Sequence, residues 1–193
     1  MNGYKFSDYK LETMKLLAIE TSCDETAMAV FDIEGLISGK ATANEALLVD
    51  LHKYTDTIIT QLLQDSPVRE ETITTINEVS ASLLPIEPGA PLAIALYELL
   101  ENSIQHAFKE EALANYIHIS FTNEYLTEQS AFRYCLTVQD NGRGLPDDVD
   151  PQARETAGMA ILHTMAERLA GSLNFNSKDG TSISLTFTYK ERL

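Results

Sequence analysis

The chain has 193 residues, of which 44% are hydrophobic, so it can bury one sizeable domain with an appendage, or two small domains. It carries 29 Asp and Glu residues against 14 Lys and Arg, a formal net charge of -15. Such a charge repels phosphate backbones and anionic membranes, so we expect no nucleic-acid partner. A polyphosphate ligand would need backbone amides, a bridging cation or a single well-placed arginine.

The two cysteines, Cys23 and Cys135, are far apart and in no metal-like spacing. We interpret Cys135, in the strand-like stretch FRYCLTV, as a small buried hydrophobe. A reducing cytoplasm is the expected location, since no signal peptide is visible and no apolar run approaches the roughly 18 residues of a membrane span.

The first 45 residues are predicted to form an appendage. Residues 1–13 have no clear periodicity and are interpreted as a loose leader. Residues 15–20 and 26–33 are apolar and predict two short strands around the polar turn TSCDE. This short N-terminal β-hairpin precedes the main domain, which we place at 46–193.

Helix and strand patterns alternate in the first half of that domain. Apolar residues at helical spacing from 41 to about 64 predict a helix that ends before Pro67. The Thr- and Ile-rich residues 72–82 predict a strand, and PIEPGAP (85–91) predicts a loop. A helix covering 97–108 follows, because Leu96, Leu99, Leu100, Ile104 and Phe108 form an apolar stripe.

The second half is predicted to be mainly strands. Residues 116–127 and 132–140 alternate as strands, 140–158 is a Gly/Pro-rich loop, and 159–171 is an amphipathic helix closed by Gly171. The last two segments, 172–177 and 181–189, predict a hairpin with an Asp-Gly turn of the two-residue type. The order predicts an α+β fold, a two-layer sandwich with helices on one face of a mixed, mostly antiparallel sheet.

Three short stretches at element boundaries carry the candidate chemistry. On the helix 97–108, Glu98, Asn102 and Gln105 share a face, although a solvated polar face is the ordinary explanation. Asp140 ends a strand in DNGRGLP, and the third stretch is DGTSISLTF. Each alone is compatible with an ordinary turn or surface; their order and positions favour a common site.

Residues 46–193 resemble the catalytic, ATP-binding domain of sensor histidine kinases, which has the Bergerat fold shared with gyrase and MutL ATPases. The match rests on PLAIALYEL, on the helix ending N-x-x-x-H-A-F (Asn102 and 106–108), on DNGRGLP and on TAGMAILHTMAERLAGSL. The resemblance implies binding of ATP and Mg²⁺. It also implies a phosphoacceptor or response-regulator protein as partner and a possible homodimer.

At the phosphate end, the resemblance implies that Asn102 coordinates the Mg²⁺ that bridges the ATP phosphates. Glu98 would lie beside it and orient water or assist a proton transfer. Gly158 would let backbone amides and a helix N-terminus approach the phosphates.

At the adenine end, the resemblance implies that Asp140 accepts a hydrogen bond from the adenine amino group. Gly142 and Gly144 would shape the adenine pocket, because glycine allows close approach of a ligand. Thr181 would contact the adenine side through its hydroxyl or a water.

Two features depart from the family pattern. Many kinases have Lys or Arg where Gln105 stands, so one phosphate-neutralising charge is missing, and Arg143 or Arg154 is a candidate replacement. The predicted lid DDVDPQARETA is also strongly acidic for a segment near ATP.

None of the four histidines matches the family's phosphoacceptor pattern. His52 is interpreted as a surface histidine of the domain's first helix, whereas His118 and His163 are interpreted as structural. His106 belongs to the helix motif already described. We therefore expect the phosphoacceptor to lie on another chain or on a part of the protein that is not evident here.

A second resemblance covers residues 15–32, KLLAIETSCDETAMAVFD, which are similar to the N-terminus of the tRNA threonylcarbamoyladenosine synthesis family. That family's H-x-x-x-H metal pair has no counterpart, because no two histidines are four residues apart.

Three functions are in competition. The leading hypothesis is the Mg-ATP-binding catalytic domain of a two-component sensor histidine kinase. The alternatives are an ATP-binding regulator or serine kinase like the anti-sigma-factor proteins, and a fragment related to tRNA modification.

Overall fold

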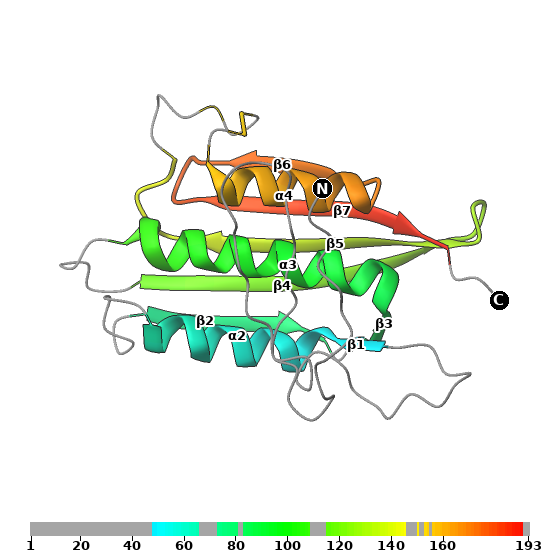
Figure 1. Ribbon diagram of the computed structural model, residues 1–193, viewed down its shortest axis with the longest axis horizontal. Helices are drawn as coiled ribbons and strands as arrows, with labels where there is room; N and C mark the ends of the chain where they lie inside the picture. Colours follow the sequence, from blue (N-terminus) through cyan, green and yellow to red (C-terminus); the bar gives the residue numbers. More distant parts are fainter. Residues whose placement is uncertain are drawn as a thin grey trace, which may run out of the picture.

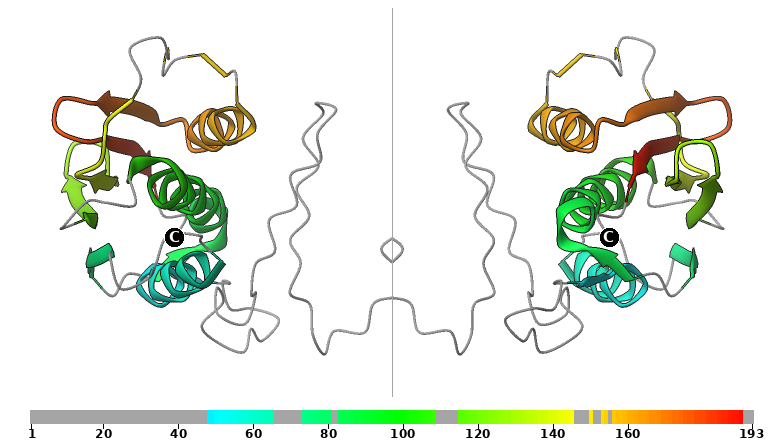
Figure 2. Two further views of the ribbon diagram at one scale, coloured as in Figure 1. Left: turned by 90° about the vertical axis from the view of Figure 1, so that its left-hand side faces the viewer. Right: turned by 90° about the vertical axis from the view of Figure 1, so that its right-hand side faces the viewer.

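The structure, a computed structural model, describes residues 48–65, 73–80, 83–108, 115–145, 150, 153–154 and 156–190. The predicted leader, the predicted N-terminal hairpin and Cys23 lie outside these residues. The described chain has two layers, a sheet and a set of helices that lie along its strands (Figure 1). The end-on views show the helices on one face of the sheet (Figure 2).

The sheet has five strands in the order β2-β4-β5-β7-β6. Strand β2 (Ile73–Val79) runs parallel to β4 (Asn115–Leu126), and the remaining pairs are antiparallel. The other three strands are β5 (Ala131–Asp140), β6 (Ser172–Asn176) and β7 (Ser182–Tyr189). The predicted mixed, mostly antiparallel sheet is thus confirmed.

Helices α2 (Leu51–Asp65), α3 (Ile86–Asn102) and α4 (Ala157–Arg168) cover one face of this sheet. The central helix, α3, contacts both of the others. Its predicted apolar stripe is buried, with Leu96, Leu99 and Leu100 each at most 2% exposed. None of the helices in the described ranges is long and apolar enough to cross a membrane.

The first helix starts later than predicted. Residues Leu48–Asp50 form strand β1, which pairs antiparallel with β3 (Leu83–Pro85) in a separate two-stranded sheet. Helix α2 begins at Leu51, where the Asp50 carboxylate accepts a hydrogen bond from the Lys53 amide at 3.1 Å, as in an N-cap. Local periodicity does not distinguish β1 from the helix that follows it, because the pairing partner β3 lies more than thirty residues further along the chain.

The predicted loop at 85–91 is also wrong, because α3 already begins at Ile86. Pro88 stands in the first turn, where a missing N–H costs little. Pro91 lies inside the helix and leaves one hydrogen bond unmade. Gly89 fits the helix against β1, since a Cβ at this position would be 2.7 Å from a methyl carbon of Val49. This packing outweighs the local proline and glycine signals.

The end of the helix 97–108 is a π-helical turn. Helix α3 passes at Ser103 into a π-turn, Ser103–Ala107, and the chain becomes extended at Phe108. Such turns are rare and concentrate at functional sites.

The end of α4 differs from its prediction. The helix stops at Arg168, and Ala170, not Gly171, takes the left-handed conformation with φ 48°. The amides of Ala170 and Gly171 donate to Glu167 and Ala166, which is a Schellman motif. Gly171 is required for another reason: its Cβ would be 2.7 Å from the carbonyl oxygen of Thr186 on β7.

The predicted closing hairpin is present as β6 and β7, but its turn is longer than two residues. Residues 177–181 connect the strands, and Gly180 has a φ of +94°. The Asp-Gly pair therefore marks a left-handed residue in a longer loop.

Cys135 is not a buried hydrophobe. It is half-buried on the face of β5 opposite the helices, where its sulfur accepts a hydrogen bond from the Thr186 hydroxyl at 3.5 Å. The residues on either side of it, Tyr134 and Leu136, point into the core, so strand alternation places Cys135 outside.

Candidate functional site

A pocket of about 240 Å³ lies between the end of α3, the ends of β5 and β7 that face it, and the start of α4. Its apolar walls come from all four elements and from β6. Its polar lining residues are Asn102, Ser103, His106, Asp140, Arg143, Thr156 and Thr181.

Asp140 is the most enclosed polar group of this pocket, with 2% of its surface exposed. Its Oδ1 accepts from the amides of Gly142 at 2.9 Å and Thr181 at 3.0 Å. Its Oδ2 accepts from the Ser103 hydroxyl at 3.0 Å. A buried carboxylate needs such donors, and these three bonds orient it.

Glycines bring the backbone segments around Asp140 into contact. A Cβ on Gly142 would be 2.4 Å from the Ala107 carbonyl oxygen, and the same oxygen accepts from the Arg143 amide. A Cβ on Gly180 would be 2.1 Å from the Asp140 carbonyl oxygen. Gly144, with a φ of +74°, lines the pocket. The β5 exit and the β6–β7 turn therefore close the pocket only with glycine at these positions.

Glu98 and Asn102 lie one turn apart on α3, next to the first turn of α4. A Cβ on Gly158 would be 2.9 Å from Glu98 Oε2 and 3.9 Å from Asn102 Nδ2. Gly158 lies inside α4, whose N-cap is Thr156; the Thr156 hydroxyl accepts from the Met159 amide at 3.3 Å. The site thus combines a carboxyl, an amide and a helix N-terminus.

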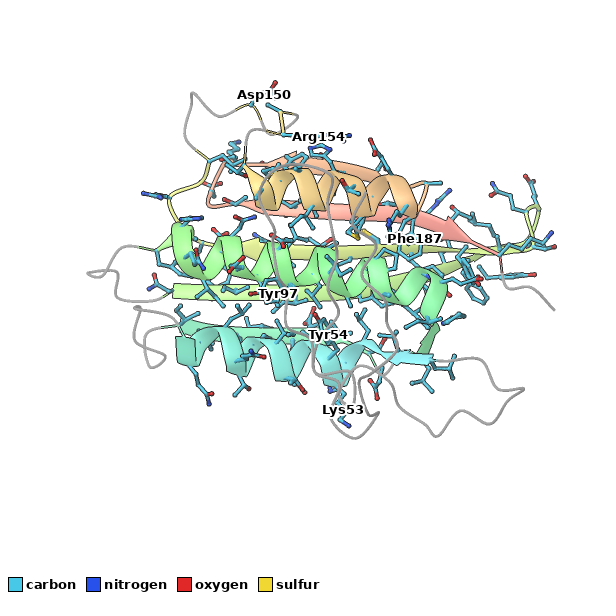
Figure 3. The ribbon with its side chains drawn as sticks, in the orientation of Figure 1. Lys53, Tyr54, Tyr97, Asp150, Arg154 and Phe187 are labelled. Atoms are coloured by element: carbon cyan, nitrogen blue, oxygen red, sulfur yellow. The ribbon has the colours of Figure 1, made fainter. Side chains whose placement is uncertain are left out.

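The Glu98 carboxyl is 7% exposed, and burial raises its pKa from 4.5 to about 7, with a smaller contribution from the nearby charge of Glu101. Glu101 is itself held on α3, since its Oε1 accepts from Gln105 at 3.1 Å and from Tyr97 at 3.5 Å. Tyr97, the donor to Glu101, lies with Tyr54 of α2 between the two helices (Figure 3). Glu98 is therefore poised to gain or lose a proton near neutral pH.

The donor set fits a magnesium ion that is held mainly by its ligand. The described residues contain no cluster of three or more His, Cys, Asp or Glu side chains able to hold a metal. Mg²⁺ keeps several waters and is typically bound by one or two protein oxygens together with substrate phosphates. Asn102 Oδ1 and Glu98 Oε2, which lie 4.0 and 2.9 Å from a Cβ built on Gly158, provide a small set of oxygens of this kind.

The basic residues differ in their access to the pocket. Arg143 lines it, whereas Arg154 forms an ion pair with Glu167 of α4. Figure 3 shows Arg154 in the segment before α4. Gln105 is exposed and bonded to Glu101. Of the two predicted replacements for the missing charge, Arg143 is the one positioned at the pocket. Most of the acidic lid lies outside the described residues.

The histidines take different places. His52 lies in the first turn of α2, half-exposed, and its Nδ1–H donates to the Val79 carbonyl at 2.6 Å, as expected for a histidine of the first helix. His118 on β4 bonds Glu78 at 2.8 Å, and His163 on α4 packs against Phe175. His106, in the π-turn, lines the pocket.

The structure brings all seven predicted residues to one locality. Asn102, Asp140, Gly144 and Thr181 line the pocket itself. Thr181 bonds Asp140 through its backbone amide, a contact that was not predicted. Glu98, Gly142 and Gly158 form its immediate border.

Sequence reasoning missed Ser103, Thr156 and Gly180. Thr156 had a detectable signal, since a threonine before a helix is a common N-cap. Ser103 had no such signal, and the Asp-Gly pair marked Gly180 only as a turn residue; their contacts with Asp140, 37 and 40 residues away, could not be predicted.

Comparison with known proteins agrees with this geometry. Residues 90–191 match the family described as histidine kinase-, DNA gyrase B-, and HSP90-like ATPase. The sensor histidine kinase PdtaS of Mycolicibacterium smegmatis is 26% identical over 186 residues, 89% of this chain and 35% of PdtaS. The sensor protein LytS of Streptococcus mutans is 36% identical over 109 residues, 50% of this chain and 18% of LytS.

The fold agrees with that of the histidine kinase domain from the Erythrobacter litoralis EL346 blue-light activated histidine kinase. The TM-score is 0.63 at 22% identity, over 77% of this chain and 65% of the other. The chain spans about a third of the length of the PdtaS relatives. These findings confirm the resemblance to the histidine-kinase ATP-binding domain. The second resemblance, at residues 15–32, lies outside the described residues and is not among these findings. The chain belongs to the family of histidine kinase-, DNA gyrase B- and HSP90-like ATPases.

Proposed function

We propose that this chain is the Mg-ATP-binding catalytic domain of a two-component sensor histidine kinase. In this function it transfers the γ-phosphoryl group of ATP to a histidine on another chain or another part of the protein. The observation that carries the proposal is the buried, oriented carboxylate of Asp140 in a pocket that borders Glu98, Asn102 and the α4 N-terminus. The names of the relatives PdtaS and LytS support the same class.

The adenine base would occupy the part of the pocket next to Asp140. Both acceptor positions of Oδ1 are used by backbone amides, and one position of Oδ2 is used by Ser103. Among the donors of the described residues, these three leave one acceptor position open, which suits a single N–H of the adenine amino group. Apolar side chains such as Leu99, Val138 and Ile183 provide walls for a flat base.

The phosphates would extend toward α4. The first-turn amides of α4 favour negative charge, and Gly158 leaves room for close approach beside Glu98 and Asn102. Asn102 would hold the magnesium ion with its amide oxygen, and Arg143 would supply positive charge at the pocket. Bound Mg²⁺ neutralises the phosphate charge that develops during transfer.

The residue best placed to move a proton is Glu98. With a pKa of about 7, its carboxyl has a substantial ionised fraction at neutral pH. In that form it can accept a proton from a nucleophile or orient a water. Asn102, which cannot titrate, would position rather than transfer.

Calorimetric titration of the purified chain with ATP tests the proposal directly. We expect binding that strengthens at least tenfold when Mg²⁺ is added, and that weakens tenfold or more in Asp140→Asn. Absence of ATP binding with or without Mg²⁺ would refute the proposed function.

Transfer is tested with labelled ATP and a separate chain that carries a dimerisation domain with its phosphoacceptor histidine. A sensor kinase gives an acid-labile phosphohistidine, and a response-regulator protein then accepts the phosphoryl group. An acid-stable phosphoserine on a partner would instead indicate the serine-kinase alternative. ATP binding with no transfer in either assay would favour a regulatory binding protein.

A further inference from the structure

Ser103 occupies a buried position at the start of the π-turn, immediately after Asn102. It is 7% exposed. Its backbone amide donates to the Leu100 and Leu99 carbonyls, so the residue is held by the last turn of α3. Its hydroxyl donates across to Asp140 Oδ2 at the end of β5, 37 residues away. The bond therefore joins the helix layer to the sheet at the floor of the pocket.

The bond also limits what Asp140 can offer to a ligand. A carboxylate has about four acceptor positions. Three are filled by Gly142, Thr181 and Ser103. Two of these donors are backbone amides of the β5 exit and the β6–β7 turn, whereas Ser103 is the side-chain donor that constrains Oδ2. With its proton committed to Asp140, the hydroxyl is not available to donate to the ligand.

The π-turn holds this arrangement from its other end as well. The Ala107 carbonyl at the end of the turn accepts from the Arg143 amide at 3.0 Å, and Gly142 packs against the same carbonyl. Both ends of the turn are thus tied to the segment 140–143, so the distance between Ser103 and Asp140 is set by several contacts.

Resting on the ATP binding proposed above, we propose that Ser103 is a positioning residue that makes the pocket selective for a 6-aminopurine over a 6-oxopurine. It leaves one acceptor on Asp140, which pairs with an exocyclic amino group. A 6-oxo group at the same place puts an acceptor opposite the open acceptor of Asp140, so the direct hydrogen bond between ligand and carboxylate is lost. Without the Ser103 hydroxyl, Oδ2 has two open positions, and a water or a tilted base can use the second one.

The test compares dissociation constants for ATP and inosine triphosphate in the wild type, Ser103→Ala and Ser103→Thr. We expect the wild type to prefer ATP by at least about tenfold. In Ser103→Ala, ATP affinity should fall about tenfold, which corresponds to about 1.4 kcal/mol, while inosine triphosphate affinity changes less than about twofold. Ser103→Thr keeps a hydroxyl and should retain the wild-type preference.

Ser184→Ala is the matched control, because Ser184 also joins two elements through a hydroxyl pair, 2.9 Å from Thr137, but does not line the pocket. Circular dichroism and thermal melts establish that each variant is folded. Equal losses for both nucleotides in Ser103→Ala would mean a purely structural role and overturn the proposal. An unchanged preference in that variant, or a wild type that binds ATP without preference, would overturn it too. A folded wild type that binds neither nucleotide would refute the proposed function itself.

Discussion

Replacing Glu98 by glutamine should stabilise the folded protein at neutral and alkaline pH. Glu98 is 7% exposed, and burial, with the charge of Glu101, raises its pKa from 4.5 to about 7. In the unfolded chain the Glu98 carboxyl ionises once the pH exceeds its ordinary pKa of 4.5, whereas in the folded chain it stays protonated until about pH 7. The contribution of Glu98 to stability is therefore greatest at acid pH, where its carboxyl is neutral. This contribution to the free energy of unfolding falls as the pH rises from about 4.5 through about 7.

The size of the effect follows from the shift. At about 1.4 kcal/mol per pKa unit, the raised pKa corresponds to about 3 kcal/mol of unfolding free energy lost between about pH 4 and pH 8. Glutamine has nearly the same shape and no charge to bury. The advantage of Glu98→Gln over the wild type should therefore grow by about 3 kcal/mol across that range.

Urea titrations at about pH 4, 5.5, 7 and 8 measure this difference, with equal m-values as the check on two-state unfolding. Glu124→Gln, at an exposed carboxylate paired with Arg133, is the control and should change stability by no more than about 0.5 kcal/mol. A Glu98→Gln advantage that does not vary with pH, or that grows toward acid pH, would show that burial of the charge is not the cause.

Four further predictions concern binding and backbone geometry. Asn102→Ala should remove the Mg²⁺-dependent gain in ATP affinity without unfolding the chain; a full gain in calorimetry would contradict the metal assignment. Asp140→Asn should weaken ATP at least about tenfold and reduce the preference for ATP over GTP, since an amide offers a donor where the carboxylate offers only acceptors. Gly180→Ala should cost about 2 kcal/mol or more in urea unfolding, because φ is +94° and the new Cβ would be 2.1 Å from the Asp140 carbonyl oxygen. Deletion of residues 1–40 should leave ATP affinity within a factor of about three, since all proposed contacts lie between Glu98 and Thr181; a tenfold loss in a folded truncation would place that segment in the site.

Local pattern alone determined most of the sheet and its helical cover. Alternation in 116–127 and 132–140 predicted β4 and β5 to within a residue or two, because one face of each strand is buried and the other is not. The apolar stripe of 97–108 predicted a buried helix face for the same reason. The candidate residues Asn102 and Asp140 could be named because they lie in motifs that resemble those of the histidine-kinase ATP-binding domain, each at an element boundary.

Features that depend on contacts between distant segments could not be predicted in this way. The pairing of β1 with β3 shortened one helix and converted an expected Gly/Pro loop into the start of another. Each local signal was correct as a preference, but strand pairing and the close packing of Gly89 on Val49 outweighed it.

The functional site likewise has features that could be predicted from the sequence and features that depend on contacts between distant segments. From the sequence by itself, the resemblance to histidine kinases predicted that Glu98, Asn102, Asp140 and Thr181 belong to one site, and the structure places them in and beside one pocket. Only the tertiary structure decided that the Thr181 amide and the Ser103 hydroxyl fill acceptor positions of Asp140. These atoms meet because the register of β5 with β7 and the π-turn after α3 bring three strand and helix ends to one point. Hydrogen-bond partners separated by 37 to 41 residues leave no trace in local periodicity, since periodicity records which face of an element is buried and not what lies against it.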